Sequence, residues 1–369
     1  MLLKGVRRTP FVVIVLCLTA AGCGGENAPT PGPTFPTTAP VTSSVADRGA
    51  ESDRLMAGLD AAQPGCSVAV AVEGRVVWTG SRGLADVAAS TAITPDTVFD
   101  IASVSKQFTA GAILLLAQEG RLSLEDPVST HLGTLPPWAA ETTIGTLMHH
   151  VSGIPDIYDV MLKAEVPQTA PLTQDQAVGY VATTTLGPER GRFSYSNSNY
   201  LLLAEIVRVV SGTPLPQFLA ERFFRPLDLD MVVEPVRAVP GKARSYLREG
   251  ASPATLTEAT PWEFYGAGGI QTTASELARW ADNYRTGRVG GQPFLDAQLA
   301  SPARVGRDGY GAGLFLDHDG TLAHGGYWDG FSSQFAVSED RRTAMAGLCN
   351  APLPPAHSNA WAAIERIWM

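Results

Sequence analysis

The stretch Ser103-Val104-Ser105-Lys106 opens a helical pattern early in the folded part of the chain. Apolar residues continue it at intervals of three and four: Val104, Phe108, Ala112, Leu115 and Leu116. This spacing predicts a helix that carries Ser103 in its first turn and ends near Gly120. A lysine three residues after a serine lies one helical turn away on the same face, so Lys106 is placed to take the proton of the Ser103 hydroxyl.

Lys106 stands out because lysine is rare in this chain. The sequence holds 23 arginines and only four lysines. A lysine accepts a proton near neutral pH once burial or neighbouring positive potential lowers its pKa, whereas arginine stays charged. Chance alone gives about 0.25 Ser-x-x-Lys matches in a chain of this composition, so the motif needs support from elsewhere in the sequence.

Two further motifs follow in order, Tyr195-Ser196-Asn197 and His324-Gly325-Gly326. All three motifs together arise by accident at a frequency of about 0.02. We expect the Tyr195 phenol to relay the proton from Ser103 to the leaving group, because a nearby lysine cation lets a phenol ionise below its usual pKa of about 10. A buried aromatic residue without this role is the alternative.

Asn197 and His324 add polar groups to this set. The Asn197 amide has both a donor and an acceptor, so it can hold a substrate amide and Lys106 together, or cap the following helix, or do both. His324 can orient the tyrosine or meet a substrate carboxylate, although a mostly neutral ring holds an anion weakly. A plain surface histidine is the alternative.

The glycines of the third motif allow the backbone to approach a substrate closely. Gly325 and Gly326 are expected to lie on an edge strand, so that the backbone amides of Tyr327 and Ser103 form an oxyanion hole. Two residues are expected to border the acyl pocket because they follow the motif directly: Trp328 and Asp329.

Strand patterns occur at both ends of the folded part. Residues 66–79 alternate in polarity around Glu73-Gly74, which predicts a β-hairpin. Further strands are predicted at 314–316, 333–337 and 343–349, before a closing helix at 360–368. The region from about 126 to 275 is richer in helix signals. The sequence therefore predicts an α/β (α+β) fold, with helices flanking an antiparallel sheet that the C-terminal strands complete around a helical insert.

Three helix boundaries are marked within that insert. Thr173-Gln174-Asp175-Gln176 reads as a capping box ahead of a helix at 177–185. An apolar helix is predicted at 199–210, closed by Gly212. Thr273-Ala274-Ser275-Glu276 is a second predicted capping box.

The N-terminus is predicted to be an export signal. Three cations and no acid precede an apolar run at 11–21 that is too short to span a bilayer. The run ends in a pattern similar to a bacterial lipoprotein box, so residues 1–22 are predicted to be removed and Cys23 to carry the lipid anchor. An ordinary signal peptide cleaved nearby is the alternative. Either route exports the chain, to the outer face of the cell membrane as a lipoprotein or as a secreted protein.

A linker is predicted between this signal and the folded part. Residues 23–46 are rich in Pro, Thr, Gly and Ser, and such a segment cannot bury a core. Residues 47–369 are expected to form one catalytic unit. Loss of residues 1–22 removes three cations and no acid, which changes the formal net charge from −9 to −12. A chain this acidic is not expected to bind nucleic acid.

Two cysteines remain in the folded part, Cys66 and Cys349. Cys66 begins the first predicted strand and Cys349 ends the last one, so the thiols meet if these strands are antiparallel neighbours. A disulfide persists in an exported protein. The sequence leaves open both a Cys66–Cys349 disulfide and two separate buried thiols.

Together the three motifs resemble those of the serine β-lactamase and penicillin-binding DD-peptidase superfamily, in the branch that holds class C β-lactamases, D-alanyl-D-alanine carboxypeptidases and related esterases. The resemblance runs from about Asp47 to the C-terminus. Residues 147–155 (Leu-Met-His-His-Val-Ser-Gly-Ile-Pro) are similar to the segment after the nucleophile helix, and residues 266–273 (Gly-Ala-Gly-Gly-Ile-Gln-Thr-Thr) to the glycine turn. The resemblance implies an α/β sandwich and an all-helical subdomain with the site in the cleft between them.

The resemblance also implies a class of substrate. Class C β-lactamases carry Lys-Thr-Gly where this chain has His324-Gly325-Gly326, which is closer to the His-x-Gly of carboxypeptidases and esterases. It therefore implies a serine hydrolase with a covalent acyl-enzyme, foremost a D-alanyl-D-alanine carboxypeptidase-like peptidase that needs no cofactor. An esterase, a weak class C-like β-lactamase and a penicillin-binding lipoprotein that holds its acyl group without turnover are the alternatives. The expected partners are small-molecule or peptide substrates, and the membrane through the N-terminal lipid.

Other hydrolase classes lack their motifs in this sequence. The Gly-x-Ser-x-Gly of an α/β-hydrolase does not occur. The His-Glu-x-x-His of a metallohydrolase does not occur either, and His149-His150 and His318-Asp319 lack the spacing of metal ligands. We therefore expect a site without a metal ion.

Overall fold

The computed structural model describes residues 44–237, 239–247, 255–257, 260–300, 303–352 and 355–369, which belong to one compact unit. The predicted signal peptide 1–22, the predicted anchor Cys23 and most of the predicted linker 23–46 lie outside the described residues. Within the described ranges, no helix combines the length and the apolar character that crossing a membrane requires.

The first helix, α1 (Val45–Ala57), begins inside the predicted linker. Ser44 caps it: the Ser44 hydroxyl accepts from the Asp47 N–H at 3.1 Å, and the Asp47 carboxylate accepts from the Ser44 N–H at 3.2 Å. This capping box satisfies two backbone donors at once. The boundary predicted at residue 46 is therefore too late, because Ser44 and Asp47 start a helix two residues earlier.

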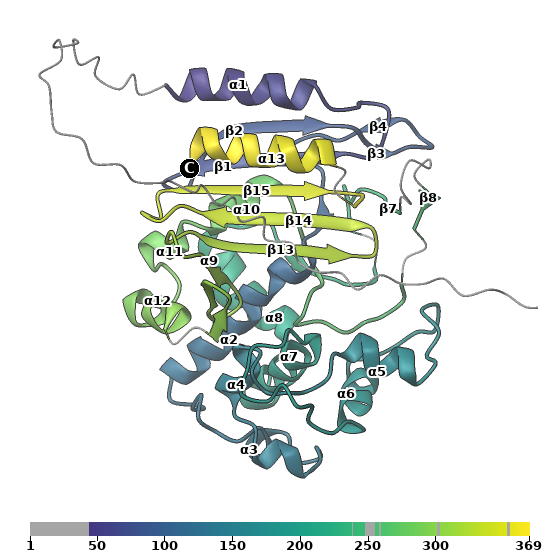
Figure 1. Cartoon of the computed structure of the whole chain (residues 1–369), viewed down its shortest axis with the longest axis vertical. Helices are drawn as coiled ribbons and strands as arrows, with labels where there is room; N and C mark the ends of the chain where they lie inside the picture. The colour runs from purple at the N-terminus through teal and green to yellow at the C-terminus, as the bar shows by residue number, and fades with distance from the viewer. Residues whose placement is uncertain (1–43, 238, 248–254, 258–259, 301–302, 353–354) are drawn as a thin grey trace, which may run out of the picture. The chain divides into compact units, whose positions relative to one another are not determined.

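An eight-stranded antiparallel sheet organises the unit (Figure 1). In spatial order its strands are β10 (Ala303–Val305), β11 (Asp308–Tyr310), β12 (Phe315–Leu316), β13 (Leu322–Trp328), β14 (Phe331–Val337), β15 (Thr343–Cys349), β1 (Cys66–Val72) and β2 (Arg75–Arg82). β1 and β2 form the predicted hairpin, with Glu73 and Gly74 at positive φ in the turn. Because β15 pairs with β1, the C-terminal strands complete the sheet, which confirms the predicted fold class.

Side chains alternate between the two faces of the sheet, as the period of a strand dictates. Val70 of β1 packs with Met56 of α1 and Ile364 of α13 (Pro355–Trp368). Its neighbour Ala69 belongs to the larger core, where α10 (Ala274–Trp280) crosses β1 and β15. Figure 1 shows α13 in front of the sheet and α10 behind it. Both faces are therefore covered, and β1 is buried along almost its whole length.

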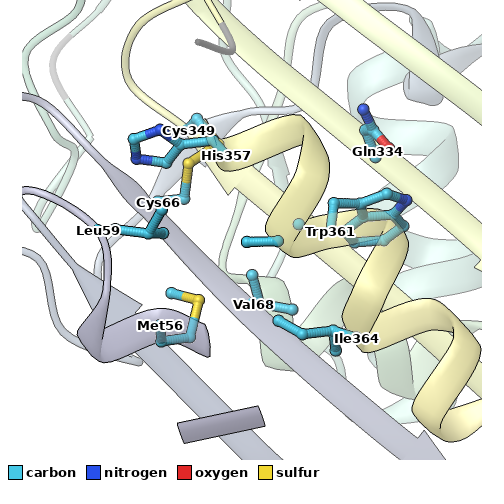
Figure 2. Close-up of a pocket in the computed structure, with 11 residues that line it drawn as sticks. Met56, Leu59, Cys66, Val68, Gln334, Cys349, His357, Trp361 and Ile364 are labelled. Carbon is cyan, nitrogen blue, oxygen red and sulfur yellow. A yellow bond between two sulfur atoms is a disulfide. The ribbon is translucent and has the colours of Figure 1, made fainter. Parts of the chain in front are cut away.

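The Cys66–Cys349 disulfide joins the neighbouring strands β1 and β15 at their ends. The register places Cys66 of β1 opposite Cys349 of β15, and the two sulfur atoms are bonded. Figure 2 shows the disulfide beside His357 and among apolar side chains of α1, β1 and α13. The bridge lies on the α1 and α13 side of the sheet and links the N-terminal hairpin covalently to the last strand.

The helical part fills the lower half of Figure 1. Its helices are α2 (Lys106–Gln118), α3 (Val128–His131), α4 (Ile144–Met148), α5 (Ile157–Lys163), α6 (Gln174–Ala182), α7 (Asn197–Ser211), α8 (Leu215–Leu219) and α9 (Arg225–Leu227), with the short turns η1 (Ala102–Ser105), η2 (Pro137–Ala140) and η3 (Ala220–Phe224). Two more helices, α11 (Asn283–Thr286) and α12 (Gly291–Leu299), lie near the sheet. Residues 106–116 of α2 are all buried, as expected for a helix that is surrounded by other elements.

The predicted helical insert of about 126–275 ends earlier than expected. After α9 the chain forms short strands instead: β6 (Val232–Val233), β7 (Tyr246–Leu247), β8 (Thr255–Leu256) and β9 (Ile270–Thr272). β9 pairs with β6 and with β5 (Phe99–Asp100), and β3 (Leu84–Asp86) pairs with β4 (Thr91–Ala92). Prolines at 235, 240 and 261 interrupt helix formation in this stretch.

The predicted helix boundaries are confirmed in two of three places. Thr173 forms its capping box with Gln176, and Gly212 closes α7 in the left-handed conformation at φ 74°. Thr273 accepts from the Glu276 N–H, but the return bond is missing. The Glu276 carboxylate accepts instead from the Asp230 N–H at 3.1 Å, so a tertiary partner replaces the local one.

Candidate active site

Ser103 lies on a strained turn just before α2. The turn η1 contains Ala102 at φ 48°, a left-handed conformation that is uncommon for alanine. The buried Asp100 carboxylate stabilises it by accepting from the Ala102 N–H at 2.7 Å. Ser103 is half-buried between fully buried neighbours, and Lys106 is the first residue of α2. Ser103 therefore precedes the helix that was predicted to contain it, and its hydroxyl faces accessible space.

Lys106 is fully buried and has three hydrogen-bond partners. Its Nζ lies 3.1 Å from Ser103 Oγ, 2.8 Å from Asn197 Oδ1 and 2.8 Å from the Ala267 carbonyl oxygen. These partners come from the turn η1, the start of α7 and the glycine turn at 266–269. Three distant segments therefore converge on one amine.

The partners of Lys106 show how a neutral amine would be oriented. The Asn197 amide oxygen and the Ala267 carbonyl oxygen only accept hydrogen bonds. A neutral amine has two N–H groups for these two oxygens, so its lone pair faces the Ser103 hydroxyl. Burial lowers the pKa of Lys106 to about 7, against the opposing effect of the Asp156 charge. At neutral pH a large fraction of the molecules therefore carries an amine that can accept the Ser103 proton.

Asp156 holds Asn197 in place. Asp156 Oδ2 accepts from the Asn197 side-chain amide at 2.8 Å and from the Asn197 backbone N–H at 2.6 Å. This fixes the Asn197 amide with its oxygen toward Lys106, and leaves one of its N–H groups for a substrate. Asn197 is the first residue of α7, after the N-cap Ser196, so the alternative of a capping role is wrong: its side chain serves the site.

Tyr195 lies beside Lys106 but does not ionise as predicted. Lys106 Nζ is 4.9 Å from the centre of the Tyr195 ring. Burial raises the pKa of Tyr195 well above its usual value, and the hydrogen bond with Ser103 lowers it by less. The prediction of an easily ionised phenol is wrong, because desolvation outweighs the influence of an amine that is itself partly neutral. Tyr195 therefore stays protonated and acts as a hydrogen-bond donor.

His150 forms the wall behind Tyr195. Its ring stacks on the Tyr195 ring with centroids 4.3 Å apart, and its Nδ1 accepts from the Ser196 N–H at 3.1 Å. Burial lowers the pKa of His150 well below its usual value, so the ring is neutral. The His150 ring thus holds the Tyr195-Ser196-Asn197 motif in place through two contacts. It stacks on the Tyr195 ring, and it accepts from the Ser196 N–H.

His324 is buried and has other partners than expected. Its Nδ1 donates to the Gly325 carbonyl oxygen at 2.6 Å, and its Nε2 lies 3.3 Å from the Tyr310 hydroxyl. Burial lowers the pKa of His324 to about 3. The alternative of a plain surface histidine is wrong. The His324 ring lies beside the Tyr195 ring with centroids 6.3 Å apart, so His324 can orient Tyr195 through ring packing. As a neutral ring it offers no charge to a carboxylate.

β13 passes directly against the nucleophile turn. A Cβ at Gly326 would lie 2.6 Å from the Ile101 carbonyl oxygen, so only glycine fits there, whereas at Gly325 the nearest atom would be 3.7 Å away. β12 pairs with β13 only at residues 322 and 323, so within the described part of the chain the stretch 324–328 has no strand on its outer side. Tyr327, with half its surface exposed, borders the same pocket as Ser103.

An aromatic pocket adjoins Ser103 on the side of Asn197. Five aromatic residues line it: Tyr158, Trp262, Phe264, Tyr327 and Trp328. Tyr158 stacks on Trp328 with centroids 5.3 Å apart, and Trp262 stacks on Phe264 at 5.6 Å. Trp328 thus lies where the sequence placed it. Asp329 does not line this pocket; it accepts from Thr260 and lines the next cavity instead.

Several site residues were missed by the sequence analysis. They are Asp100, His150, Asp156, Tyr158, Trp262, Phe264 and the carbonyl of Ala267. His150 and Ala267 lie inside the two stretches that carry the resemblance, and Asp156 directly follows the first, so closer attention to those stretches would have found them. Among the residues placed by the structure, no three His, Cys, Asp or Glu side chains cluster as a metal site would require.

Known proteins are similar to this chain in sequence. A family model described as Beta-lactamase matches residues 52–367. The protein flp of Staphylococcus aureus (strain MW2) is 28% identical over 307 residues, which are 78% of this chain and 59% of flp. The putative penicillin-binding protein PbpX of Bacillus subtilis (strain 168) is 26% identical over 279 residues, 75% of this chain and 68% of PbpX. The chain thus spans about three fifths of the length of flp.

Solved structures show the same fold. A penicillin-binding protein homologue from Pyrococcus abyssi matches with a TM-score of 0.73 at 24% identity, over 88% of this chain and 78% of the homologue. A D-stereospecific amidohydrolase from Streptomyces sp. matches with a TM-score of 0.68 at 24% identity, over 82% of this chain and 94% of that one. The D-amino acid amidase of Ochrobactrum anthropi SV3 matches with a TM-score of 0.70 at 24% identity, over 88% and 96%.

Proposed function

Because this chain belongs to the Beta-lactamase family, whose superfamily comprises penicillin-binding serine hydrolases, we propose that it hydrolyses D-alanyl-D-alanine peptides through a covalent acyl-enzyme on Ser103. The observation that carries the proposal is the 3.1 Å contact between Lys106 Nζ and Ser103 Oγ. The other two hydrogen bonds of Lys106 leave its lone pair for that hydroxyl. A nucleophile paired with a buried base is the arrangement that acyl transfer requires.

In the first step, Lys106 accepts the Ser103 proton as Oγ attacks the substrate carbonyl carbon. The developing oxyanion is bound by the backbone amides of Ser103 and Tyr327. Tyr195 donates its proton to the leaving atom, and the Lys106 ammonium returns a proton to Tyr195. Its raised pKa keeps Tyr195 protonated until the leaving group takes the proton.

In the second step, water attacks the acyl-enzyme and the same groups act in reverse. Lys106 is neutral again after the first step, so it can accept a proton from the water. The acyl product then leaves and Ser103 regains its proton. No group outside the described site is needed for either step.

Hydrolysis of D-aminoacyl amides or esters without a terminal carboxylate is a second candidate. It is favoured by the neutral, buried His324, which stands where a lysine would supply a cation for that carboxylate. Two proteins of the same fold are a D-stereospecific amidohydrolase and a D-amino acid amidase. Weak β-lactam hydrolysis and a persistent penicillin adduct would use the same Ser103.

A side-by-side assay tests the proposal. The purified folded unit is given a D-alanyl-D-alanine peptide, a D-alanine amide, a nitrophenyl ester and a chromogenic cephalosporin, and its intact mass is followed after penicillin is added. Turnover of the peptide supports the proposal, and turnover of the amide or ester alone supports the second candidate. Ser103→Ala is expected to lose at least ~10³-fold in rate. A variant that keeps its activity would contradict both candidates.

The location of the protein remains part of the same proposal. We propose that the chain is exported and anchored by a lipid on Cys23. Metabolic labelling with a fatty acid, compared between the wild type and Cys23→Ala, tests this. Loss of the label in the variant is expected, whereas an unlabelled wild type would favour plain secretion.

A further inference from the structure

The position of Tyr195, which donates the proton to the leaving atom, indicates on which side of Ser103 the acyl group lies. Tyr195 and His324 do not line the aromatic pocket, whereas Ser103, Asn197 and Trp328 do. The leaving atom must face Tyr195 to receive its proton. The acyl group therefore points the other way, into the aromatic pocket.

The aromatic pocket is too small for a long acyl group. It offers about 60 Å³, which is room for a few atoms. A cavity of about 500 Å³ adjoins it and shares Pro235 and Trp328 with its wall. A longer acyl group therefore has this second cavity beside the aromatic pocket, past Trp328, into which it can extend.

The second cavity is lined by charges of both signs. They are Asp100, Asp329, Lys242, Arg237 and Arg244. Asp100 accepts from the Ala102 N–H and from Gln271, and Asp329 accepts from the backbone and hydroxyl of Thr260. Both carboxylates already have partners within the protein.

The two arginines also have partners. Arg237 pairs with Glu234 at 3.2 Å, and Arg244 lies 3.7 Å from Asp86. The Arg237 side chain is 86% exposed, so it lies at the rim rather than inside. Neither arginine is therefore the cation that a ligand deep in the cavity would meet.

Lys242 is different from all four. Its ammonium lies 5.1 Å from the centre of the Phe331 ring, and among the described residues it has no hydrogen bond and no carboxylate within 4 Å. Three ammonium donors are thus left for a ligand. Burial lowers the pKa of Lys242, which the charges of Asp100, Asp329 and Glu234 oppose. An anion at this ammonium would compensate its desolvation further.

We propose that the cavity behind Trp328 binds a carboxylate at the far end of the acyl group, with Lys242 as the cation that recognises it. This subsite rests on the proposed acyl transfer at Ser103. It assigns to the protein a class of substrate, acyl groups that end in a carboxylate a few carbons from the scissile carbonyl.

A series of matched substrates tests the subsite. Nitroanilides of D-alanine carry N-succinyl, N-glutaryl, N-adipoyl or N-pimeloyl groups, and each is compared with its own methyl ester, which has the same length but no charge. At one or two chain lengths, the carboxylate is expected to raise kcat/KM about tenfold or more over the ester. Equal values at every length would overturn the subsite, whatever the variants show.

Variants then assign the effect to Lys242. In Lys242→Met and Lys242→Gln the ratio of carboxylate to ester is expected to fall to about one. Lys163→Met, which removes an exposed lysine of α5, is expected to keep the wild-type ratio. A ratio that survives both Lys242 variants would overturn the assignment. If the wild type cleaves the nitroanilides but shows no preference for the carboxylate over the methyl ester, the subsite alone is refuted. If the wild type cleaves none of these nitroanilides, and also neither the D-alanyl-D-alanine peptide nor the nitrophenyl ester, the acyl transfer on which the subsite rests is refuted.

Discussion

Lys106 contacts Ser103 and Lys242 lines the second cavity, and the two lysines differ in what surrounds them. Burial lowers the pKa of both. Lys106 has three protein partners within 3.1 Å, whereas the Lys242 ammonium has none among the described residues. A lysine whose amine has a protein partner at every hydrogen-bonding position can exchange a proton with one of those partners. A lysine whose ammonium donors have no protein partner can bind a ligand instead.

The surrounding backbone differs in the same way. The partners of Lys106 come from the turn η1, from the first residue of α7 and from a glycine turn that packs on α7. Lys242 lies in an irregular stretch between β6 and β7, where it forms an isolated bridge with Val98. Lys106 and Asn197 each begin a long helix, whereas Lys242 lies in a loop, where residues that choose the substrate are common.

Replacement of Lys106 is expected to have the largest effect. Lys106→Met should reduce the acylation rate by at least ~10³-fold, because the Ser103 hydroxyl loses the lone pair that accepts its proton. Stopped-flow or intact-mass measurement of acylation checks this, with near-ultraviolet circular dichroism as the control for folding. A folded Lys106→Met variant that acylates at the wild-type rate would remove the contrast between the two lysines.

Replacement of Asp156 is expected to have a smaller effect, with a distinct signature. Asp156→Asn removes the charge that raises the pKa of Lys106, so the rising limb of kcat/KM against pH should move to lower pH. The rate on the plateau should fall about tenfold, because Asn197 loses its charged partner. Asp159→Asn, at an exposed position of the same helix, serves as the control. A limb that moves to higher pH would contradict the account.

Replacement of His150 is expected to have the smallest effect on activity. His150→Phe keeps a ring against Tyr195 but removes the acceptor of the Ser196 N–H, which costs about 1–3 kcal/mol in the free energy of unfolding. kcat should fall several-fold while the midpoint of the pH profile stays in place, because His150 is neutral throughout. Urea unfolding and a pH profile measure these effects, and the exposed His318→Phe is the control. A displaced midpoint would give His150 a role in proton transfer.

Local spacing explains what the sequence could predict. Ser103 and Lys106 lie one turn apart on the same segment, and Tyr195 and Asn197 are two residues apart, so each pair was predictable. The hairpin and the long strands β14 and β15 follow from period-two patterns, and they confirm the fold.

Burial by distant residues explains what the sequence could not predict. The state of Tyr195 and His324 depends on desolvation by residues such as His150 and Tyr310, which lie elsewhere in the chain. The Glu276 carboxylate accepts from the distant Asp230 N–H instead of from the N–H of its own helix cap. Lys242 carries no motif, and only the structure places it behind Trp328.

The pH dependence of Ser103 acylation in the wild type tests the central claim most directly. Protonated Lys106 cannot accept the serine proton, so the acylation rate constant, measured from pH 5 to 10, is expected to rise with a midpoint near 7 and then level off. A rate that stays flat across this range, or that rises only near pH 10, would show that a neutral Lys106 is not the base.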